Sequence, residues 1–219
     1  MMFILPKNIT KFIFLNIFYI SNFLAIGACT PVIIGSAAVT AAIVVSDRRT
    51  AGTQLEDKNI ELKIGKRVMK KLNHNTNRII ANSYNRRLLL TGDVDSEQSK
   101  KIATTLAQSV ENVISVNNQM KIRPIASIAQ RSSETWIESK IKSILSAKMQ
   151  YRIINAVIDR DTVYLMGLVT HEEGKKAALI VSNINGVNQV VKFFEYISQE
   201  EANRLGLSNF SKVKSHKIH

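Results

Sequence analysis

The residue whose position most strongly suggests chemistry is Cys29, the single cysteine of the 219-residue chain. It directly follows an apolar stretch, residues 12–28, which is preceded by Lys7 and Lys11 and ends in small residues. A charged start, a short apolar stretch and a small-residue exit are typical of a secretory signal peptide. A single cysteine also excludes an intramolecular disulfide and a cysteine-based zinc cluster. The sequence therefore predicts a thiol at an export cleavage point.

The four residues that end in Cys29, of sequence IGAC, resemble the lipobox of bacterial lipoproteins. The resemblance implies that a signal peptidase cleaves before Cys29, that its thiol carries a diacylglyceryl group and that its new amine is acylated, for instance with palmitate. Each buried CH₂ contributes about 0.8 kcal/mol, so three acyl chains would anchor the protein almost permanently. In similar lipoproteins an aspartate directly after the cysteine changes the membrane to which the protein is sorted. Thr30 stands at this position, so the resemblance implies sorting to the outer membrane. We expect residues 1–28 to be the signal peptide and residues 29–58 to be the lipidated amino terminus and tether.

A competing interpretation is an uncleaved transmembrane helix in which Cys29 is a small buried residue. A bilayer span requires about 20 consecutive apolar residues, and Asn16, Ser21 and Asn22 interrupt this stretch. The position of the only cysteine therefore favours lipidation. Residues 30–46 are also apolar and uncharged, and we interpret them as a tether or lipid-hugging segment, with a membrane-buried hairpin as the alternative.

Side chains that could support catalysis or metal binding are poorly arranged elsewhere in the sequence. The motifs GxSxG and HExxH and a phosphate-binding glycine loop do not occur. His74 and His171 have no acidic or cysteine neighbour at ligand spacing, and the other two histidines lie in the last four residues. Asp93 and Asp95 could form a paired-carboxylate site, but Asp95 or Ser96 is better placed to cap the helix that follows. We predict a non-enzymatic protein with no catalytic residue, no metal and no cofactor.

An internal repeat positions the remaining candidate residues. Apolar residues recur in phase at spacings of 73 to 75, most clearly between residues 87–94 and residues 162–169. The repeat predicts two copies of one small domain with a short linker and a polar basic tail, whose composition is typical of a disordered segment. The expected parts are residues 59–124, 125–132 (the linker), 133–198 and 199–219 (the tail).

Each copy has the pattern helix, strand, strand, helix, strand. In the second copy, apolar residues from Ile137 to Leu145 share one helical face, and Thr135 with Glu138 fits a capping box at the start of that helix. Gly167 is predicted to end the strand pair. Two helices on one face of a three-stranded mixed sheet give an α+β fold. The expected elements after the first helix are strands 151–158 and 162–169, helix 171–183 and strand 188–197.

This repeat resembles the BON domain, an αββαβ fold of bacterial envelope proteins. From Cys29 to about Ser198, the chain is similar to the dual-BON outer-membrane lipoproteins of Gram-negative bacteria that bind anionic phospholipid and are associated with cell division. The most specific segments are residues 47–54, 135–137 and 163–170. The resemblance implies a lipid-anchored protein that faces the periplasm, contacts an anionic phospholipid membrane and supports outer-membrane integrity, with the outer-membrane assembly machinery as a further partner.

The charge of the chain is unevenly distributed. It has 30 Lys+Arg against 17 Asp+Glu and a formal net charge of +13, which indicates a polyanionic partner. Residues 59–124 contain 12 Lys+Arg against 5 Asp+Glu, whereas residues 133–198 contain 8 against 7. Clustered cations on a helix usually form a face that is exposed to solvent. The alternatives are that the cations bind anionic lipid, with a binding free energy of about 1 kcal/mol per cation, or that they bind an acidic envelope partner such as a β-barrel assembly component. Nucleic acid suits the charge but not an exported chain. The clustered cations of the first helix are Lys63, Lys66, Arg67, Lys70 and Lys71.

Trp136 is the only tryptophan and lies off the apolar face that contains Ile137, because Lys140 occupies its i+4 position. An indole beside a cation suits a membrane interface, although a tryptophan that packs at the rim between the two domains fits equally well. The resemblance implies that Trp136 contacts phospholipid. It extends this role to four neighbours, Thr135, Ile137, Ser139 and Lys140. Acidic residues at positions 134 and 138 add negative charge to the same segment.

Overall fold

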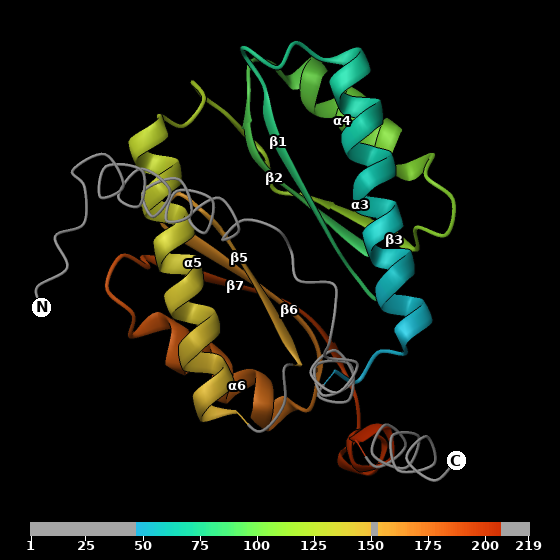
Figure 1. Cartoon of the computed structure of the whole chain (residues 1–219), viewed down its shortest axis with the longest axis vertical. Helices are drawn as coiled ribbons and strands as arrows, with labels where there is room; N and C mark the ends of the chain where they lie inside the picture. The colour runs from blue at the N-terminus through green and yellow to red at the C-terminus, as the bar shows by residue number, and fades with distance from the viewer. Residues whose placement is uncertain (1–46, 150–152, 207–219) are drawn as a thin grey trace, which may run out of the picture. The chain divides into compact units, whose positions relative to one another are not determined.

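The computed structural model describes residues 47–149 and 153–206. The predicted signal peptide, Cys29 and most of the tether lie outside these residues. Two α+β domains follow one another in the described chain (Figure 1). The first contains α3 (Ala51–Lys71), β1 (Arg78–Tyr84), β2 (Arg87–Val94), α4 (Glu97–Gln108), β3 (Ser115–Asn118) and β4 (Lys121–Ile122). The second contains α5 (Ile128–Lys148), β5 (Ile154–Asp159), β6 (Thr162–Val169), α6 (His171–Ser182) and β7 (Gln189–Tyr196).

Both domains have a mixed sheet with the same strand order. In the second domain β6 is central, antiparallel to β5 and parallel to β7. In the first domain β2 is central, but the last strand is split, so that β3 and β4 both pair with it and the sheet has four strands. The split arises because the Asn118 side chain accepts a hydrogen bond from the Met120 N–H (3.0 Å) and donates one to the Lys100 carbonyl (3.2 Å). The last strand of the first copy therefore differs from the single strand predicted.

The central strands are buried on both faces. In β2, Leu88 and Leu90 join the core that α3 and α4 cover, whereas Leu89 points to the opposite face. In β6, Leu165 joins the core under α5 and α6, and Tyr164 points to the opposite face. Residues of both sheets meet there in a third apolar cluster. The two sheets thus contact each other through the faces that the helices leave open, and the helices form the outer layers.

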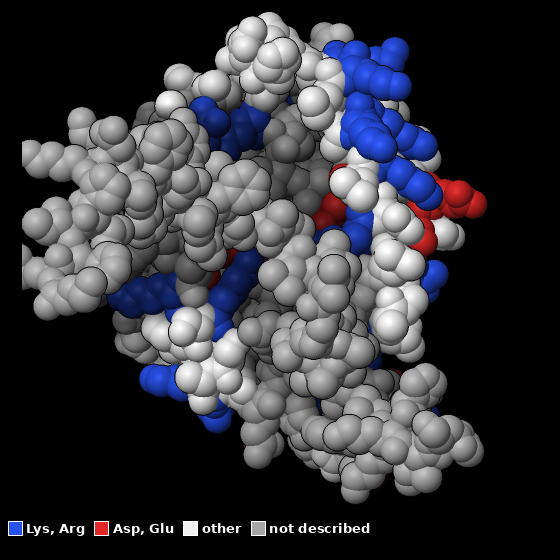
Figure 2. All heavy atoms as spheres, viewed as in Figure 1, with Lys and Arg blue, Asp and Glu red and all other residues white. Residues whose placement is uncertain are grey.

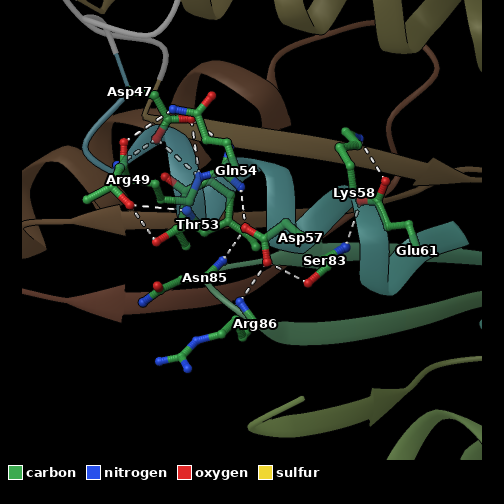
Figure 3. Close-up of polar contacts among 12 residues, drawn as sticks. Asp47, Arg49, Thr53, Gln54, Asp57, Lys58, Glu61, Ser83, Asn85 and Arg86 are labelled. Carbon is green, nitrogen blue, oxygen red and sulfur yellow. Dashed lines mark hydrogen bonds and ion pairs between the residues drawn. The ribbon is translucent and has the colours of Figure 1, made fainter. Parts of the chain in front are cut away.

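A buried carboxylate holds α3 against the β1–β2 hairpin (Figure 3). Asp57 accepts hydrogen bonds from the Ser83 hydroxyl (2.7 Å), from the backbone N–H groups of Asn85 (2.9 Å) and Arg86 (2.7 Å), and from the Arg49 guanidinium (2.7 Å). Asn85 and Arg86 both have positive φ, as the favoured two-residue hairpin turn requires. Four donors converge on one carboxyl, so the turn and the rotation of α3 are fixed together.

The segment before α3 connects the two domains. Arg48 donates to both carboxylate oxygens of Glu173 (2.7 and 2.8 Å) and to the Leu168 carbonyl (2.8 Å). Glu173 also accepts from the Thr170 N–H in the capping box of α6. A bidentate, largely buried arginine pair adds geometric specificity to this contact.

Two further predictions differ from the structure. Gly167 lies inside β6, paired with Ile154, and does not end the strand; a Cβ there would come within 2.5 Å of the Ile153 carbonyl oxygen, because the neighbouring strand crosses close to it. Residues 199–206, predicted as part of a polar tail, form a short helix. Ala202 of this helix is buried, and Leu205 packs against the cluster between the sheets.

None of the helices in residues 47–149 and 153–206 is both long and apolar enough to cross a membrane. The same residues contain no group of three or more His, Cys, Asp or Glu side chains able to hold a metal ion.

Candidate functional site

The predicted phospholipid-contact residues lie on α5, which begins earlier than the sequence suggested. Its amino-terminal cap is Ser127, which forms a capping box with Gln130. Thr135, predicted as the cap, lies two turns inside the helix, and its hydroxyl donates to the Arg131 carbonyl (2.9 Å). The capping box predicted at Thr135 and Glu138 is therefore wrong. Both segments match the Ser/Thr-x-x-Glu/Gln pattern, and the upstream one is used.

Trp136 is exposed on the surface of α5. Its side chain is 63% accessible, and the Lys140 ammonium lies 5.1 Å from the ring centroid, within the range of a cation–π interaction. Exposed Thr135 and Ser139 flank the indole. The Ser139 hydroxyl donates to the Thr135 carbonyl (2.8 Å), and Thr135 is bonded in the same way to the preceding turn. The structure thus confirms that Trp136 stands off the apolar face beside a cation, and excludes its burial at a rim within the described chain.

Ile137 does not share this exposure. It is buried in the core of the second domain with Ile141 and Leu145. A Cβ at Gly186 would lie 2.7 Å from the Ile137 Cδ1 atom, so Gly186, which has a φ of +95°, provides space for this side chain. Of the five predicted contact residues, Ile137 is therefore a core residue and not part of the surface.

The two acidic neighbours of Trp136 are paired with cations. Glu134 is buried and accepts from the Arg78 guanidinium (2.7 Å) and from the Arg160 N–H (3.0 Å). Glu138 accepts from Lys142 one turn along the helix. The negative charge expected beside Trp136 is thus neutralised, and Glu134 faces into the molecule.

Glu134 belongs to a buried cluster of charges, which we call the interdomain ion cluster: Arg78, Asp93, Arg123, Glu134, Asp159 and Arg160. The Arg123 guanidinium donates to Asp93 and to both oxygens of Asp159 (2.9 Å each). Arg160 donates to Asp93 (3.3 Å) and to the Pro124 carbonyl (2.9 Å). Residues of both domains alternate in this cluster, so it holds the start of α5 in place and orients the surface around Trp136.

The two aspartates of the cluster have pKa values shifted in opposite directions. Burial alone would raise the pKa of Asp93, but hydrogen bonds from Arg123 and from the Ala126 N–H (2.7 Å) hold it below its usual value. Burial raises the pKa of Asp159, and Arg123 offsets only part of that effect. Charged residues inside apolar strands were the sequence signal for this cluster, which sequence reasoning missed.

Asp93 and Asp95 do not form a paired-carboxylate site. Asp95 points away from the cluster and accepts from the hydroxyls of Ser99 (2.6 Å) and Thr76 (2.7 Å) and from the Asn77 amide (2.9 Å). These hydrogen bonds, with that of Ser99 the largest influence, lower the pKa of Asp95. Ser96, one of the two residues predicted for this role, caps α4.

Comparison with known proteins agrees with the repeat. The BON domain family matches residues 56–124 and 133–198. The chain is 37% identical over 172 residues to the outer membrane lipoprotein DolP of Haemophilus influenzae, covering 77% of this chain and 89% of that protein. It is 28% identical over 154 residues to a 21 kDa hemolysin of Actinobacillus pleuropneumoniae, covering 69% of this chain and 79% of that protein.

Two matched regions, together with a relative aligned over most of both chains, establish the architecture and the location in the outer membrane. The chain therefore belongs to the BON-domain family, as a dual-BON outer-membrane lipoprotein of the DolP type.

Proposed function

We propose that this protein is a non-enzymatic lipoprotein that binds anionic phospholipid through the exposed surface of α5. This surface, which we call the Trp136 surface, consists of Thr135, Trp136, Ser139 and Lys140. Acylated Cys29 anchors the chain in the outer membrane, and the two domains face the periplasm. Its biological role is the maintenance of outer-membrane integrity at the division site, as the resemblance to the division-associated lipoproteins implies.

The observation that carries the proposal is the exposed indole of Trp136 beside Lys140. An indole favours the membrane interface, because its apolar body and polar N–H suit the boundary between acyl chains and headgroups. The ammonium beside it supplies a charge for a lipid phosphate. The hydroxyls of Thr135 and Ser139 donate to helix carbonyls, so they bring no unpaired donor into the interface.

Replacing Trp136 with glutamate is expected to weaken binding of the non-acylated mature chain, residues 30–219, to phosphatidylglycerol vesicles. The substitution removes the inserting group and adds a charge that anionic lipid repels. Because Trp136 is exposed, the circular dichroism spectrum should not change. Vesicle cosedimentation measures the binding, and we expect a loss of at least tenfold.

The matched control is Leu179→Glu on α6, at a side chain of similar exposure (66%). It introduces the same charge outside the Trp136 surface and should leave binding near the parent value. Equal binding by the Trp136→Glu variant and the parent would contradict the proposed function.

Lipidation at Cys29 predicts a specific mass. The protein extracted from membranes should begin at Cys29 and carry three acyl chains, because the thiol and the new amine are both modified in lipoproteins. Intact-mass spectrometry measures this directly. A mass that corresponds to an uncleaved chain would contradict lipidation at Cys29. It would not bear on lipid binding by the Trp136 surface, which the vesicle experiment tests separately.

A further inference from the structure

The first domain carries an exposed apolar row that the Trp136 surface does not account for. Leu55, Leu62 and Met69 on α3 are 65%, 62% and 73% accessible. They are spaced seven residues apart, so they lie on one side of the helix over a length of roughly 21 Å. We call this row, with the lysines on either side of it, the α3 outer face. Three large apolar side chains in one exposed row point to an interaction surface.

The packing of α3 fixes this row outward. Ile60 and Ile64 are fully buried on the opposite side of the helix. Asp57 binds the β1–β2 turn, and Glu61 accepts from the Ser83 N–H (2.9 Å) (Figure 3). Rolling the helix to bury Leu62 would break these hydrogen bonds, so the row remains exposed.

The charge beside the row is positive. Lys58 and Lys66 lie one turn from members of the row, and Lys63 and Lys70 lie on the flank of the helix beside it. Two of these lysines have acidic neighbours, since Lys58 pairs with Glu61 (2.7 Å) and Lys63 lies 4.0 Å from Glu111. Lys66 and Lys70 therefore supply most of the positive charge beside the row. Figure 2 shows basic side chains gathered along the side of the molecule where Figure 1 draws α3. Long lysine stems lie along apolar surface while their ammonium groups remain in water.

The internal repeat relates this face to the Trp136 surface. Ile64 and Ile137 are equivalent core residues 73 positions apart. At the same spacing, Leu62 and Lys63 occupy the positions that Thr135 and Trp136 occupy in α5. The two copies thus present the same side of the same helix, one with an indole and the other with aliphatic residues and more cations.

These observations favour a lipid surface over a protein partner. A partner helix in a coiled coil needs apolar residues every 3.5 positions on average, but Lys58 and Gly65 stand between the members of the row. A second copy would bring like charges together. We propose that the α3 outer face is a second binding surface for anionic phospholipid, in which Leu55, Leu62 and Met69 insert and the lysines contact headgroups.

The sheets meet through their open faces, and α3 and α5 belong to opposite outer layers. We therefore expect a chain that uses both surfaces to join two bilayers. Lipid binding by the α3 outer face does not depend on the Trp136 surface. Only the joining of two bilayers requires that the Trp136 surface also binds lipid, as proposed above.

The first test is vesicle clustering by the non-acylated chain, residues 30–219, followed by light scattering. With phosphatidylglycerol vesicles in excess we expect clustering by the parent and by Leu179→Glu. The double variant Leu62→Glu with Met69→Glu should bind vesicles without clustering them. Clustering equal to that of the parent would overturn the α3 assignment.

A second test reports on α3 when the Trp136 surface is absent. Cys29 is the only cysteine, so in residues 30–219 a single Leu62→Cys substitution can carry an environment-sensitive nitrobenzoxadiazole label. In a Trp136→Glu background, its emission should shift to the blue with phosphatidylglycerol vesicles and not with phosphatidylcholine vesicles. Adding Met69→Glu should weaken this binding about tenfold, the effect of losing one partly inserted side chain.

The same label at Leu179→Cys is the matched control and should not respond. An unchanged emission at position 62 with phosphatidylglycerol would overturn the proposal, whatever the result for Trp136. A response to polyglutamate instead of vesicles would also overturn it and assign the face to an acidic protein.

Discussion

Replacing Arg123 with methionine is expected to lower the free energy of unfolding at pH 7 by about 3 kcal/mol. Removing one partner of a buried ion pair leaves an uncompensated charge, which typically costs about 3–5 kcal/mol. Here two carboxyl groups each lose one partner, because Arg123 donates to both Asp93 and Asp159. Asp93 keeps Arg160 (3.3 Å) and Asp159 keeps the weaker contact with Arg78 (4.0 Å). The lower end of the range applies, since the Arg123 side chain is 30% exposed. Urea unfolding followed by circular dichroism measures the change.

The difference in the free energy of unfolding between Arg123→Met and the parent should become smaller as the pH falls. In the parent, the folded pKa of Asp93 is lowered, so its pairing contributes stability above the unfolded value of about 3.9 and loses it below the folded value. The folded pKa of Asp159 is raised, so its contribution is full below the unfolded pKa and is lost as the pH rises through the folded value. Without Arg123 both carboxyl groups bind protons more readily. We therefore expect a smaller difference between variant and parent at pH 4 than at pH 7.

A double-mutant cycle separates this effect from lost packing. Asp159→Asn in the Arg123→Met background removes a buried charge that has lost its closest cation and should recover part of the lost stability. The control Arg204→Met changes an exposed arginine with a single, weak acidic contact and should alter stability by less than about 0.5 kcal/mol. An equal loss at pH 4 and pH 7 would contradict an electrostatic origin.

The local structure of each domain could be predicted because the repeat shows the same apolar pattern twice. The face of Ile137 and Ile141, the cap at Ser96 and the exposure of Trp136 depend on periodicity over a few residues, which a sequence displays directly. The position of Ile137 follows from the same pattern. It was assigned both to the core face and to the lipid contact, and only the core assignment agrees with its burial beneath Gly186.

The contact between the domains could not be predicted from periodicity, since it joins residues far apart in the chain. One signal was present. Leu88, Leu89 and Leu90 form a continuous apolar run, whereas a sheet with one solvated face shows alternation. Such a run indicates burial on both faces. The charged partners of this contact gave a weaker signal. Asp93 stands inside an apolar strand, but only the pairing of β2 with β4 shows that Arg123 lies beside it.

Replacing Gly92 with alanine is expected to destabilise the fold by about 4 kcal/mol, which is an exceptionally large loss for the addition of one methyl group. Gly92 has a φ of +114°, which side chains rarely adopt, and a Cβ there would lie 2.0 Å from the Arg78 carbonyl oxygen. The backbone of β1 must move to relieve this clash. The Gly92 N–H also donates to Asp159 (3.3 Å), so the movement disturbs the interdomain ion cluster as well. Thermal and urea unfolding measure the loss.

Two other glycines calibrate this prediction. Gly167, the equivalent residue of the second copy, approaches the Ile153 carbonyl oxygen less closely (2.5 Å) and lacks a positive φ, so Gly167→Ala should cost less than Gly92→Ala. Gly65 lies within α3 with nothing near its Cβ position, and Gly65→Ala should raise stability by about 0.5–1 kcal/mol, because alanine is the better helix former. Similar effects at all three positions would show that chain entropy dominates, and would contradict the close crossing of β1 over Gly92. If the losses follow the predicted order, the glycine at this position is required in both copies because the neighbouring strand packs closely against it.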